Sequence, residues 1–308
     1  MAEILLNTVL LLLSVALLWK GSDWLVESAA RVGHSLGMSD LTIGLTIVAF
    51  GTSAPEFAVT ISAAVTGRAD ISVGNVVGSN IFNLGFILGG CSLFAALRAE
   101  RRMVWRDGGV LVGTALLLLW MLHDRHLSHL EGGILFAGLL AYVAVLFRQK
   151  HHGEGEVPTG RATWKDGLLL LLGLAGVVGG GHLLVVSASS LARLFGISEW
   201  VIAVTIVAAG TSAPEFATSL MAAAKGRHGM SLGNLIGSDL FNLLGVLGLA
   251  GMIRNLQINP GAFSSVAMLA GMCVLVVVFM RTGWRISRWE GLVLIAIGVV
   301  RWILDFLL

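Results

Sequence analysis

The sequence predicts an all-α, polytopic membrane protein with ten transmembrane helices in two inverted-topology repeats of five helices each. Hydrophobic residues make up 56% of the 308 residues and charged residues only 12%, about half the charged share of a typical soluble domain. Residues 21–89 also align without a gap onto residues 180–248, with 34 of the 69 positions identical. The composition excludes a soluble enzyme, a nucleic-acid-binding protein and a disordered chain.

Ten apolar stretches alternate with short polar segments, and a helix needs roughly 20 residues to cross a bilayer. The first stretch follows Glu3 and lacks the basic start and cleavage site of a signal peptide, so it counts as a helix. The nine tryptophans fall near span ends, as the aromatic belt of a membrane interface predicts. The expected spans are, in chain order, 4–34, 41–65, 71–96, 105–122, 130–148, 166–194, 200–224, 230–254, 262–281 and 287–307.

One long polar stretch, from Arg148 to Lys165, lies near the middle of the chain. We therefore expect a first five-helix repeat at 1–148, a cytoplasmic linker at 149–165 and a second repeat at 166–308. Because each copy has an odd number of spans, the second copy enters the membrane inverted relative to the first. Inverted repeats are typical of secondary transporters, which bind substrates between the repeats near the bilayer midplane.

The basic residues of the loops predict that both termini lie outside a prokaryotic cell (inner) membrane. In that orientation the inside loops hold thirteen lysines and arginines, which agrees with the positive-inside rule. The outside segments hold only Arg68, Arg125, Arg193, Arg254 and Arg301.

The string Gly-Thr-Ser-Ala-Pro-Glu-Phe-Ala occurs in the second span, at 51–58, and again in the seventh, at 210–217. Its glutamates are Glu56 and Glu215. An ionisable side chain inside a span costs at least about 2.5 kcal/mol and marks a functional site by default. The proline before each glutamate removes a helical hydrogen bond and clashes with the carbonyl four residues back. We expect each helix to break just before the glutamate, lining a cavity at membrane depth.

Oxygen atoms dominate both breaks. Each would free backbone carbonyls, around 49–53 and 208–212, and the same stretches carry the hydroxyls of Thr52, Ser53, Thr211 and Ser212. Carboxylates, hydroxyls and carbonyls without His or Cys suit a hard cation such as Ca²⁺ or Na⁺. Two alternatives remain: a glutamate paired with a basic residue, although no Lys or Arg is near in these spans, and hydroxyls bonded to their own helix backbone.

A second repeated string lies in the third span at 78–83, Gly-Ser-Asn-Ile-Phe-Asn, and in the eighth at 237–242, Gly-Ser-Asp-Leu-Phe-Asn. Ser79 and Asn83 are four residues apart and share a helix face. The asparagines either line the site or link helices. Two glutamates balance one Ca²⁺ or two Na⁺, so a third Na⁺ would need a further charge. Asp239, which replaces Asn80 of the first copy, either supplies that charge or pairs with a neighbour.

The two doubled strings resemble the α-repeats of the cation/calcium exchanger superfamily, and the chain is similar to a sodium/calcium antiporter over essentially its whole length. The resemblance implies ten helices in two inverted halves, with ion sites between the second, third, seventh and eighth. It implies that Glu56 and Glu215 bind Ca²⁺ together with the backbone carbonyls of Thr52 and Thr211. It further implies Na⁺ binding by the same glutamates and by oxygens of Ala49, Ser53, Ser79, Ala208, Ser212 and Ser238, around a central pair formed by Asn83 and Asn242.

One position departs from part of that superfamily. Some members carry Asp where this chain has Asn242, and in some branches that acid accompanies potassium dependence, so the amide favours potassium-independent exchange. The resemblance implies no cofactor and no nucleic-acid or protein partner: Ca²⁺ and Na⁺ are transported substrates.

The leading expectation is a secondary active Na⁺/Ca²⁺ antiporter that works by alternating access, with the first and sixth helices moving. A H⁺/Ca²⁺ antiporter of the same fold is the nearest alternative, because a buried glutamate carries a proton as readily as Na⁺. A passive cation channel is disfavoured by the two acids at broken helices and by the lack of a carbonyl-lined filter. An enzyme is not expected, since the spans offer Ser53 and Ser212 no plausible histidine or lysine base.

Overall fold

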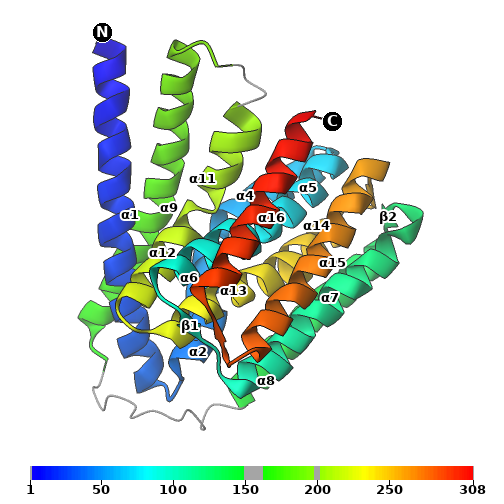
Figure 1. Cartoon of the computed structure of the whole chain (residues 1–308), viewed down its shortest axis with the longest axis horizontal. Helices are drawn as coiled ribbons and strands as arrows, with labels where there is room; N and C mark the ends of the chain where they lie inside the picture. Colours follow the sequence, from blue (N-terminus) through cyan, green and yellow to red (C-terminus); the bar gives the residue numbers. More distant parts are fainter. Residues whose placement is uncertain (1, 149–161, 198–201, 308) are drawn as a thin grey trace.

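The computed structural model describes residues 2–148, 162–197 and 202–307, and it is built almost entirely of helices (Figure 1). Each predicted span coincides with a helix or a run of helices, although residues 200–201 of the seventh span lie outside the described ranges. Of the predicted linker, only 162–165 are described. The ends of α1 and α16 that carry the two termini point to the same face of the molecule (Figure 1).

The first half contains α1 (Ala2–Ser35), α2 (Asp40–Ile43), the π-helical η1 (Gly44–Val48), α3 (Ala49–Thr52), α4 (Ala54–Val65), α5 (Ala69–Phe82), the π-helical η2 (Asn83–Ile87), α6 (Leu88–Phe94), β1 (Leu97–Arg98), the π-helical η3 (Met103–Asp107), α7 (Gly108–Met121), the 3₁₀ turn η4 (Leu122–Asp124), β2 (His126–Leu127) and α8 (His129–Arg148). The second half contains α9 (Trp164–Leu194), the π-helical η5 (Ala203–Val207), α11 (Ala208–Thr211), α12 (Ala213–Ala224), α13 (His228–Leu240), the π-helical η6 (Phe241–Val246), α14 (Leu247–Ile253), β3 (Leu256–Gln257), α15 (Pro260–Arg281), β4 (Arg285–Ile286) and α16 (Arg288–Leu307).

Within the described ranges, seven helices are long and apolar enough to cross a membrane, and the bent segment from α2 to α4 would make an eighth. The seventh predicted span is cut by residues outside the description. The tenth, α16, has the length but carries Arg288, Glu290 and Arg301. Large apolar side chains such as Trp19 and Leu130 are exposed, which suits a surface that faces lipid.

The two-fold repeat extends well past the aligned sequence. Of the seven described residues with positive φ, six form pairs that are one repeat length apart: Gly37 and Gly196, Gly67 and Gly226, and Arg125 and Trp284. The strands follow the same rule: β1 pairs antiparallel with β4, and its counterpart β3 pairs with β2. Each of these short pairs joins a loop of the first half to a loop of the second half, and the fold is otherwise the all-α one that the sequence predicts.

Serine caps begin the last helix of each half. The hydroxyl and N–H of Ser128 both bond Glu131 at the start of α8, and Ser287 bonds Glu290 in the same way at α16. This capping box satisfies N–H groups that the first turn of a helix leaves free. The repeat therefore fixes where both helices start.

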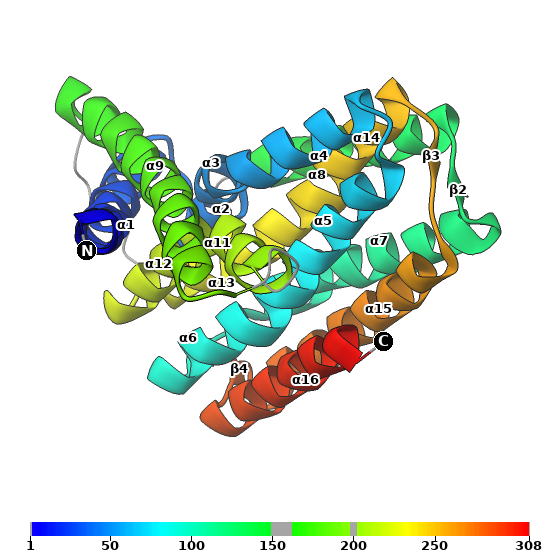
Figure 2. The same ribbon diagram turned by 90° about the horizontal axis from the view of Figure 1, so that it is seen from above.

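Helices α1 and α9 form a close antiparallel pair at one side of the bundle (Figures 1 and 2). Glycines allow this approach: a Cβ on Gly21 would lie 2.8 Å from the N atom of Val177, and one on Gly173 would lie 2.6 Å from that of Leu25. Because no larger residue fits at these crossings, α1 and α9 pack as one unit beside the other helices.

The centre of the molecule is occupied by α13. Its residues from Met230 to Leu240 are all buried, and it packs against α2, η1 and α12. Its buried face includes polar side chains, so the middle of the protein holds a polar layer inside an apolar bundle.

Candidate cation-binding site

Both helices that carry the repeated glutamates break just before them, as expected. Ser53 separates α3 from α4 and Ser212 separates α11 from α12, each with ψ near 7° instead of a helical value. The first break bends its helix by 51°. Pro55 and Pro214 fall in the first turn of the new helix, where the missing N–H has no partner to lose.

Each break places its serine on the glutamate of the other half. Ser53 Oγ donates to Glu215 Oε1 at 3.2 Å, and Ser212 Oγ donates to Glu56 Oε1 at 3.2 Å. Both glutamates are fully buried. The two repeats therefore meet at their carboxylates.

The second carboxylate oxygen of each glutamate has no hydrogen-bond partner among the described residues. Within those residues, no lysine, arginine or histidine forms an ion pair with Glu56 or Glu215. Among the described residues, nothing supports the alternative of a structural carboxylate paired with a base. A buried carboxylate without a counter-charge is strongly unfavourable, so the pair requires a cation or protons.

Next to the glutamates lies a layer of four polar residues, two from each half. Asn83 Nδ2 donates to Asp239 Oδ1 at 3.0 Å, and Asn242 Nδ2 donates to Asn80 Oδ1 at 3.1 Å. The oxygens Asn83 Oδ1, Asn242 Oδ1 and Asp239 Oδ2 are buried and find no partner in the described part of the chain. The asparagines thus link helices through nitrogen while their oxygens stay available.

The motif threonine of the first half contacts α13. Thr52 Oγ1 donates to Asn234 Oδ1 at 3.2 Å and lies 3.5 Å from Ser238 Oγ. Thr52 thereby joins the first break to the second repeat, and Ser238 lies beside it.

The carbonyl of Ala49 is less free than a broken helix suggests. It accepts the N–H of Ser53 at 3.1 Å, because that residue closes the last turn of α3. Only a second lone pair remains for a ligand. In the second half the N–H of Ser212 donates to Gly210 instead. Ala208 begins α11, and its side chain lies outside the described residues.

Two asparagines that sequence reasoning missed hold the glutamate backbones. Asn75 Nδ2 donates to the main-chain carbonyl of Glu56 at 3.3 Å and to Thr60 at 2.9 Å. Asn234 makes the mirrored bond to the carbonyl of Glu215, at 3.4 Å. Their identity in both copies of the repeat was the available signal.

The two halves differ in how tightly they close over this site. A Cβ on Gly237 would lie 2.8 Å from the Cβ of Ala49, whereas one on its counterpart Gly78 would meet no described atom within 4 Å. A cavity of about 650 Å³ takes the place of those contacts, and Ser79 and Thr211 line it. The side of the site next to Gly78 therefore opens onto a cavity, and the side next to Gly237 is closed by packing.

The cavity reaches the face that carries the chain termini. Its walls include Ile71 at the start of α5, Ala262 at the start of α15, and Arg301 and Trp302 near the end of α16, and these helix ends lie toward that face (Figure 1). The cavity thus extends from that face to Thr211 and Ser79, while α13 packs closely against η1 and α3 on the other side of the site.

The donor atoms gathered here are all oxygens. In the ranges that the structure describes, no three His, Cys, Asp or Glu residues converge as a transition-metal site would require. Carboxylate, amide, hydroxyl and carbonyl oxygens from α3, α4, α5, η2, α12, α13 and η6 instead match the preference of hard cations.

The model of the sodium/calcium exchanger protein family matches residues 6–148 and 166–300, most of the chain. The chain belongs to this family. It is therefore a membrane transporter of the cation/calcium exchanger type and not an enzyme.

The chain is similar to several known proteins over nearly their full length. The chain is 33% identical to the sodium/calcium exchanger MaX1 of Methanosarcina acetivorans, covering 94% of this chain and 96% of MaX1. It is 31% identical to the inner membrane protein YrbG of Escherichia coli, covering 97% and 96%. The solved structure of the sodium-calcium exchanger NCX_Mj superimposes with a TM-score of 0.86 at 29% identity, covering 96% of this chain and 98% of that chain. The exchanger family fold, ten helices in inverted repeats, is the fold of this chain.

Proposed function

We propose that this exchanger carries Na⁺ in one direction and Ca²⁺ in the other, and that both ions use the site between Glu56 and Glu215. The observation that supports this most is the pair of buried, unpartnered carboxylate oxygens, one from each repeat. Two negative charges can hold either one Ca²⁺ or two Na⁺, so the two ions compete for the same position. That competition couples their movements.

The ligand set of the proposal is the one the sequence predicts. Glu56 and Glu215 hold Ca²⁺, with the backbone carbonyls at Thr52 and Thr211. Sodium is bound by the same glutamates together with oxygens of the motif serines and of Ala49 and Ala208. Asn83 and Asn242 form the central pair of the site. The full set is Glu56, Glu215, Thr52, Thr211, Asn83, Asn242, Ser53, Ser212, Ser79, Ser238, Ala49, Ala208 and Asp239.

Alternating access is supported by the difference between the two glycine faces. Gly78 and Gly237 occupy equivalent positions, yet one faces a cavity and the other a packed backbone. If the halves exchange these environments, the site opens to the opposite face. The paired helices α1 and α9 pack against α12, so a movement of the pair accompanies that exchange.

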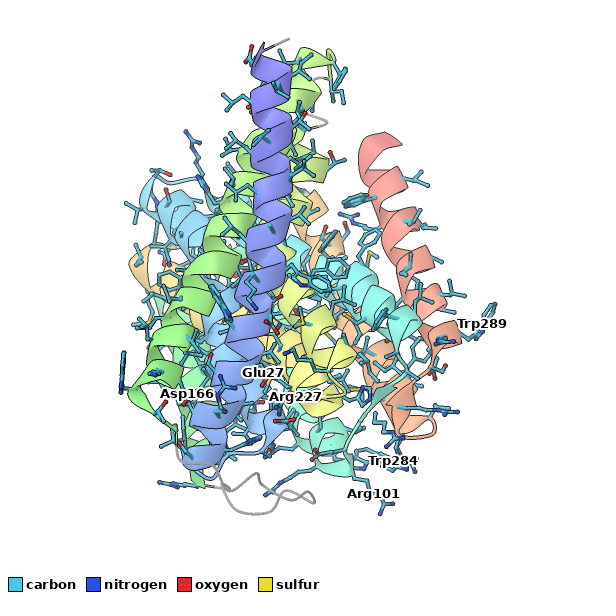
Figure 3. The ribbon with its side chains drawn as sticks, turned by 90° about the vertical axis from the view of Figure 1, so that its left-hand side faces the viewer. Glu27, Arg101, Asp166, Arg227, Trp284 and Trp289 are labelled. Atoms are coloured by element: carbon cyan, nitrogen blue, oxygen red, sulfur yellow. The ribbon has the colours of Figure 1, made fainter. Side chains whose placement is uncertain are left out.

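The open face is the outside in this proposal. The guanidinium carbons of Arg101 and Arg281 lie 4.9 and 4.6 Å from the centre of the Trp284 ring. Figure 3 shows Arg101 and Trp284 at the face opposite the N-terminus. Tryptophan is enriched at both membrane interfaces, whereas an excess of arginine and lysine is typical of the cytoplasmic one. Both termini then lie outside a prokaryotic cell membrane, and the site faces outward.

Proton/calcium exchange is the rival within the same fold, because protons also neutralise the two glutamates. The serine hydroxyls of the site favour sodium, because a proton bound to a carboxylate needs no further coordinating oxygens. These serines are Ser53, Ser79, Ser212 and Ser238.

The test is radiolabelled Ca²⁺ uptake into sodium-loaded vesicles of purified protein after external Na⁺ is removed. Glu56→Gln serves as the site variant, and Glu3→Gln, at the exposed start of α1, is the matched control. We expect uptake that requires both the sodium gradient and Glu56. Uptake that ignores sodium and stops with a protonophore would transfer the protein to the proton-coupled class.

A further inference from the structure

Five exposed arginines surround the β1–β4 strand pair at the face opposite the N-terminus, where Arg101 is labelled in Figure 3. In the described part of the chain, none of the five forms an ion pair with an acid. Residues 97–102 and 281–290 contain two acids, Glu100 and Glu290, and Glu290 caps α16. These loops therefore keep an excess of positive charge. We call the five residues the arginine patch: Arg98, Arg101, Arg281, Arg285 and Arg288.

The internal repeat shows that the fold does not require these arginines. The β2–β3 pair at the other face has the mirrored register, with His126 opposite Gln257 where the patch has Arg285 opposite Arg98. None of the five patch positions is an arginine or a lysine in the other copy of the repeat. The same strand pairing thus forms with and without the charges, so they serve a purpose other than pairing.

The arginines are also more specific than membrane topology demands. The positive-inside rule is satisfied by lysine as well as by arginine, yet residues 97–106 and 281–288 contain seven arginines and no lysine. Arginine differs in its planar fork of N–H donors, which bonds two oxygens of one phosphate at once. The use of arginine alone therefore indicates recognition of a phosphate group.

Trp284 positions two arginines of the patch. The guanidinium carbons of Arg101 and Arg281 lie 4.9 and 4.6 Å from the centre of its ring, within cation–π distance. Two like charges held this near repel each other, so an anion beside them is favoured. Trp284 has a φ of 54°, a left-handed conformation that bulky residues rarely adopt and asparagine or glycine accepts more easily. The turn therefore keeps an unfavourable residue whose ring holds the guanidiniums.

Two exposed tryptophans place the arginine patch at the membrane interface. Trp105 is 65% exposed and Trp289 is 72% exposed, and tryptophan is enriched at the level of the lipid headgroups. Trp289 lies nearer the middle of the molecule than Arg101 and Trp284 do (Figure 3). A lipid with its headgroup at Trp284 would thus have its acyl chains on the side of Trp289.

We propose that the arginine patch binds the phosphate of an anionic phospholipid, such as phosphatidylglycerol, from the membrane leaflet at this face. Arg101 and Arg281 bond the phosphate oxygens, and the other three arginines attract its net negative charge. Zwitterionic phosphatidylcholine has the same phosphate, but the patch repels its choline group. Because β1 belongs to the first half and β4 to the second, one lipid contacts both halves and stabilises their packing. The proposal does not depend on which ions are exchanged.

The variants separate phosphate recognition from charge. The double variant Arg101→Lys with Arg281→Lys keeps every positive charge and the topology, but it loses the two forks. Trp284→Asn removes the ring and suits the left-handed turn. Arg125→Lys changes the mirrored turn at the other face and is the matched control. The Tm of each variant in lipid-free micelles establishes that it is folded.

The test is native mass spectrometry of the purified full-length protein from micelles supplied with phosphatidylglycerol or phosphatidylcholine. We expect the parent and Arg125→Lys to retain one phosphatidylglycerol about tenfold more tightly than phosphatidylcholine, as a charge-assisted contact provides. The lysine double variant and Trp284→Asn are expected to lose most of that preference. A parent without preference overturns the proposal, and an undiminished preference in the lysine double variant does so too, because charge alone then suffices.

Two further measurements use the same samples. Phosphatidylglycerol is expected to raise the Tm of the parent more than phosphatidylcholine does, and to raise that of the lysine double variant no more than phosphatidylcholine does. Equal Tm shifts for the two lipids in the parent contradict a lipid bound across both halves. Inorganic phosphate at the same concentration is expected not to displace phosphatidylglycerol. Displacement would make a soluble anion the ligand and overturn the assignment to lipid.

Discussion

Ser53 donates a hydrogen bond to Glu215, which lies 162 positions away in the other repeat. The mirrored bond joins Ser212 to Glu56. Neither half can build a complete carboxylate site alone, since each supplies the acid for one position and the hydroxyl for the other. The site therefore depends on how the halves are docked, and a change in docking changes ion binding.

The serines offer the first test of this dependence. Ser53→Ala and Ser212→Ala each remove one hydrogen bond to a charged oxygen, a contribution of about 1.5–3 kcal/mol, or roughly 10- to 100-fold in affinity. We expect both to weaken Ca²⁺ binding by similar factors, because the two bonds are equally long. Isothermal titration with Ca²⁺ checks this, with Ser62→Ala, exposed on the same helix as Glu56, as the control. Strongly unequal losses would contradict the symmetric arrangement.

A second prediction separates the charge of the glutamates from their packing. Glu56→Gln and Glu215→Gln keep the shape and the acceptor oxygen for the serine but remove a buried, uncompensated charge. We expect each to abolish Ca²⁺ transport and to raise the Tm in buffer free of Na⁺ and Ca²⁺. In the parent, Ca²⁺ at 100 times its Kd stabilises the fold by about 2.7 kcal/mol.

Thermal unfolding with and without Ca²⁺ measures both effects. The Ca²⁺-dependent rise in Tm is expected to vanish in either variant and to persist in Glu3→Gln. A glutamine variant that is still stabilised by Ca²⁺ to the parental extent would remove that glutamate from the site.

The sequence is sufficient to predict Glu56 and Glu215 as site residues, but it does not predict which face of the site is open. Glu56 and Glu215 are recoverable because proline, acid and repetition coincide at one place. The π-helical segments that carry Asn83 and Asn242 have no comparable signal, since an added residue in a turn barely alters an apolar pattern. Gly78 and Gly237 are the same residue at the same position of the repeat, yet their surroundings differ. The residue type at this position therefore does not indicate which of the two faces is packed.

These two glycines supply the third prediction. Gly237→Ala forces a methyl group against the backbone of Leu45 and the side chain of Ala49, and such overpacking costs about 1–3 kcal/mol. Gly78→Ala meets no described atom in this state, so its Tm is expected to stay near that of the parent. If the opposite state closes the cavity through mirrored contacts, Gly78→Ala obstructs that state and lowers transport several-fold.

Tm values and Ca²⁺ uptake rates of the two variants give the comparison. The expected pattern is a stability loss for Gly237→Ala and a transport loss at unchanged stability for Gly78→Ala. Parental transport by Gly78→Ala would mean that α5 does not close by the mirrored contact.

The fourth prediction concerns an ion-pair bridge on the closed side. Lys225, at the end of α12, pairs through its Nζ with Asp23 Oδ1 at 2.6 Å and with Glu27 Oε1 at 2.7 Å, both on α1. Glu27 is labelled in the lower half of α1 in Figure 3. The equivalent of Lys225 in the first repeat is Thr66, so the open side has no such lysine. The bridge thus favours the state in which the side opposite the termini is closed.

Lys225→Met is expected to shift the population toward the opposite state by less than tenfold, because partly exposed ion pairs contribute about 1 kcal/mol or less. The measurement is the rate at which an impermeant maleimide labels Val207→Cys, which lines the cavity, in a chain with Cys91 and Cys273 replaced by alanine. Lys20→Met is the control, since Lys20 pairs with Asp23 inside α1 and does not bridge to α12. Slower labelling in Lys225→Met alone supports the bridge, and equal rates in both variants contradict it.

The charge of Lys225 determines how the labelling rate of Val207→Cys depends on pH. Partial burial disfavours its charge, but hydrogen bonds to Asp23 and Glu27 outweigh that effect and raise the pKa of Lys225. With a raised pKa, the bridge is fully formed below the ordinary lysine value of about 10.4 and is lost only as pH rises through the raised one. Labelling of the parent between pH 6 and 9 should therefore reveal no loss of the bridge, after correction for thiol ionisation. High salt weakens the bridge by screening, so the difference between parent and Lys225→Met is expected to narrow as ionic strength rises.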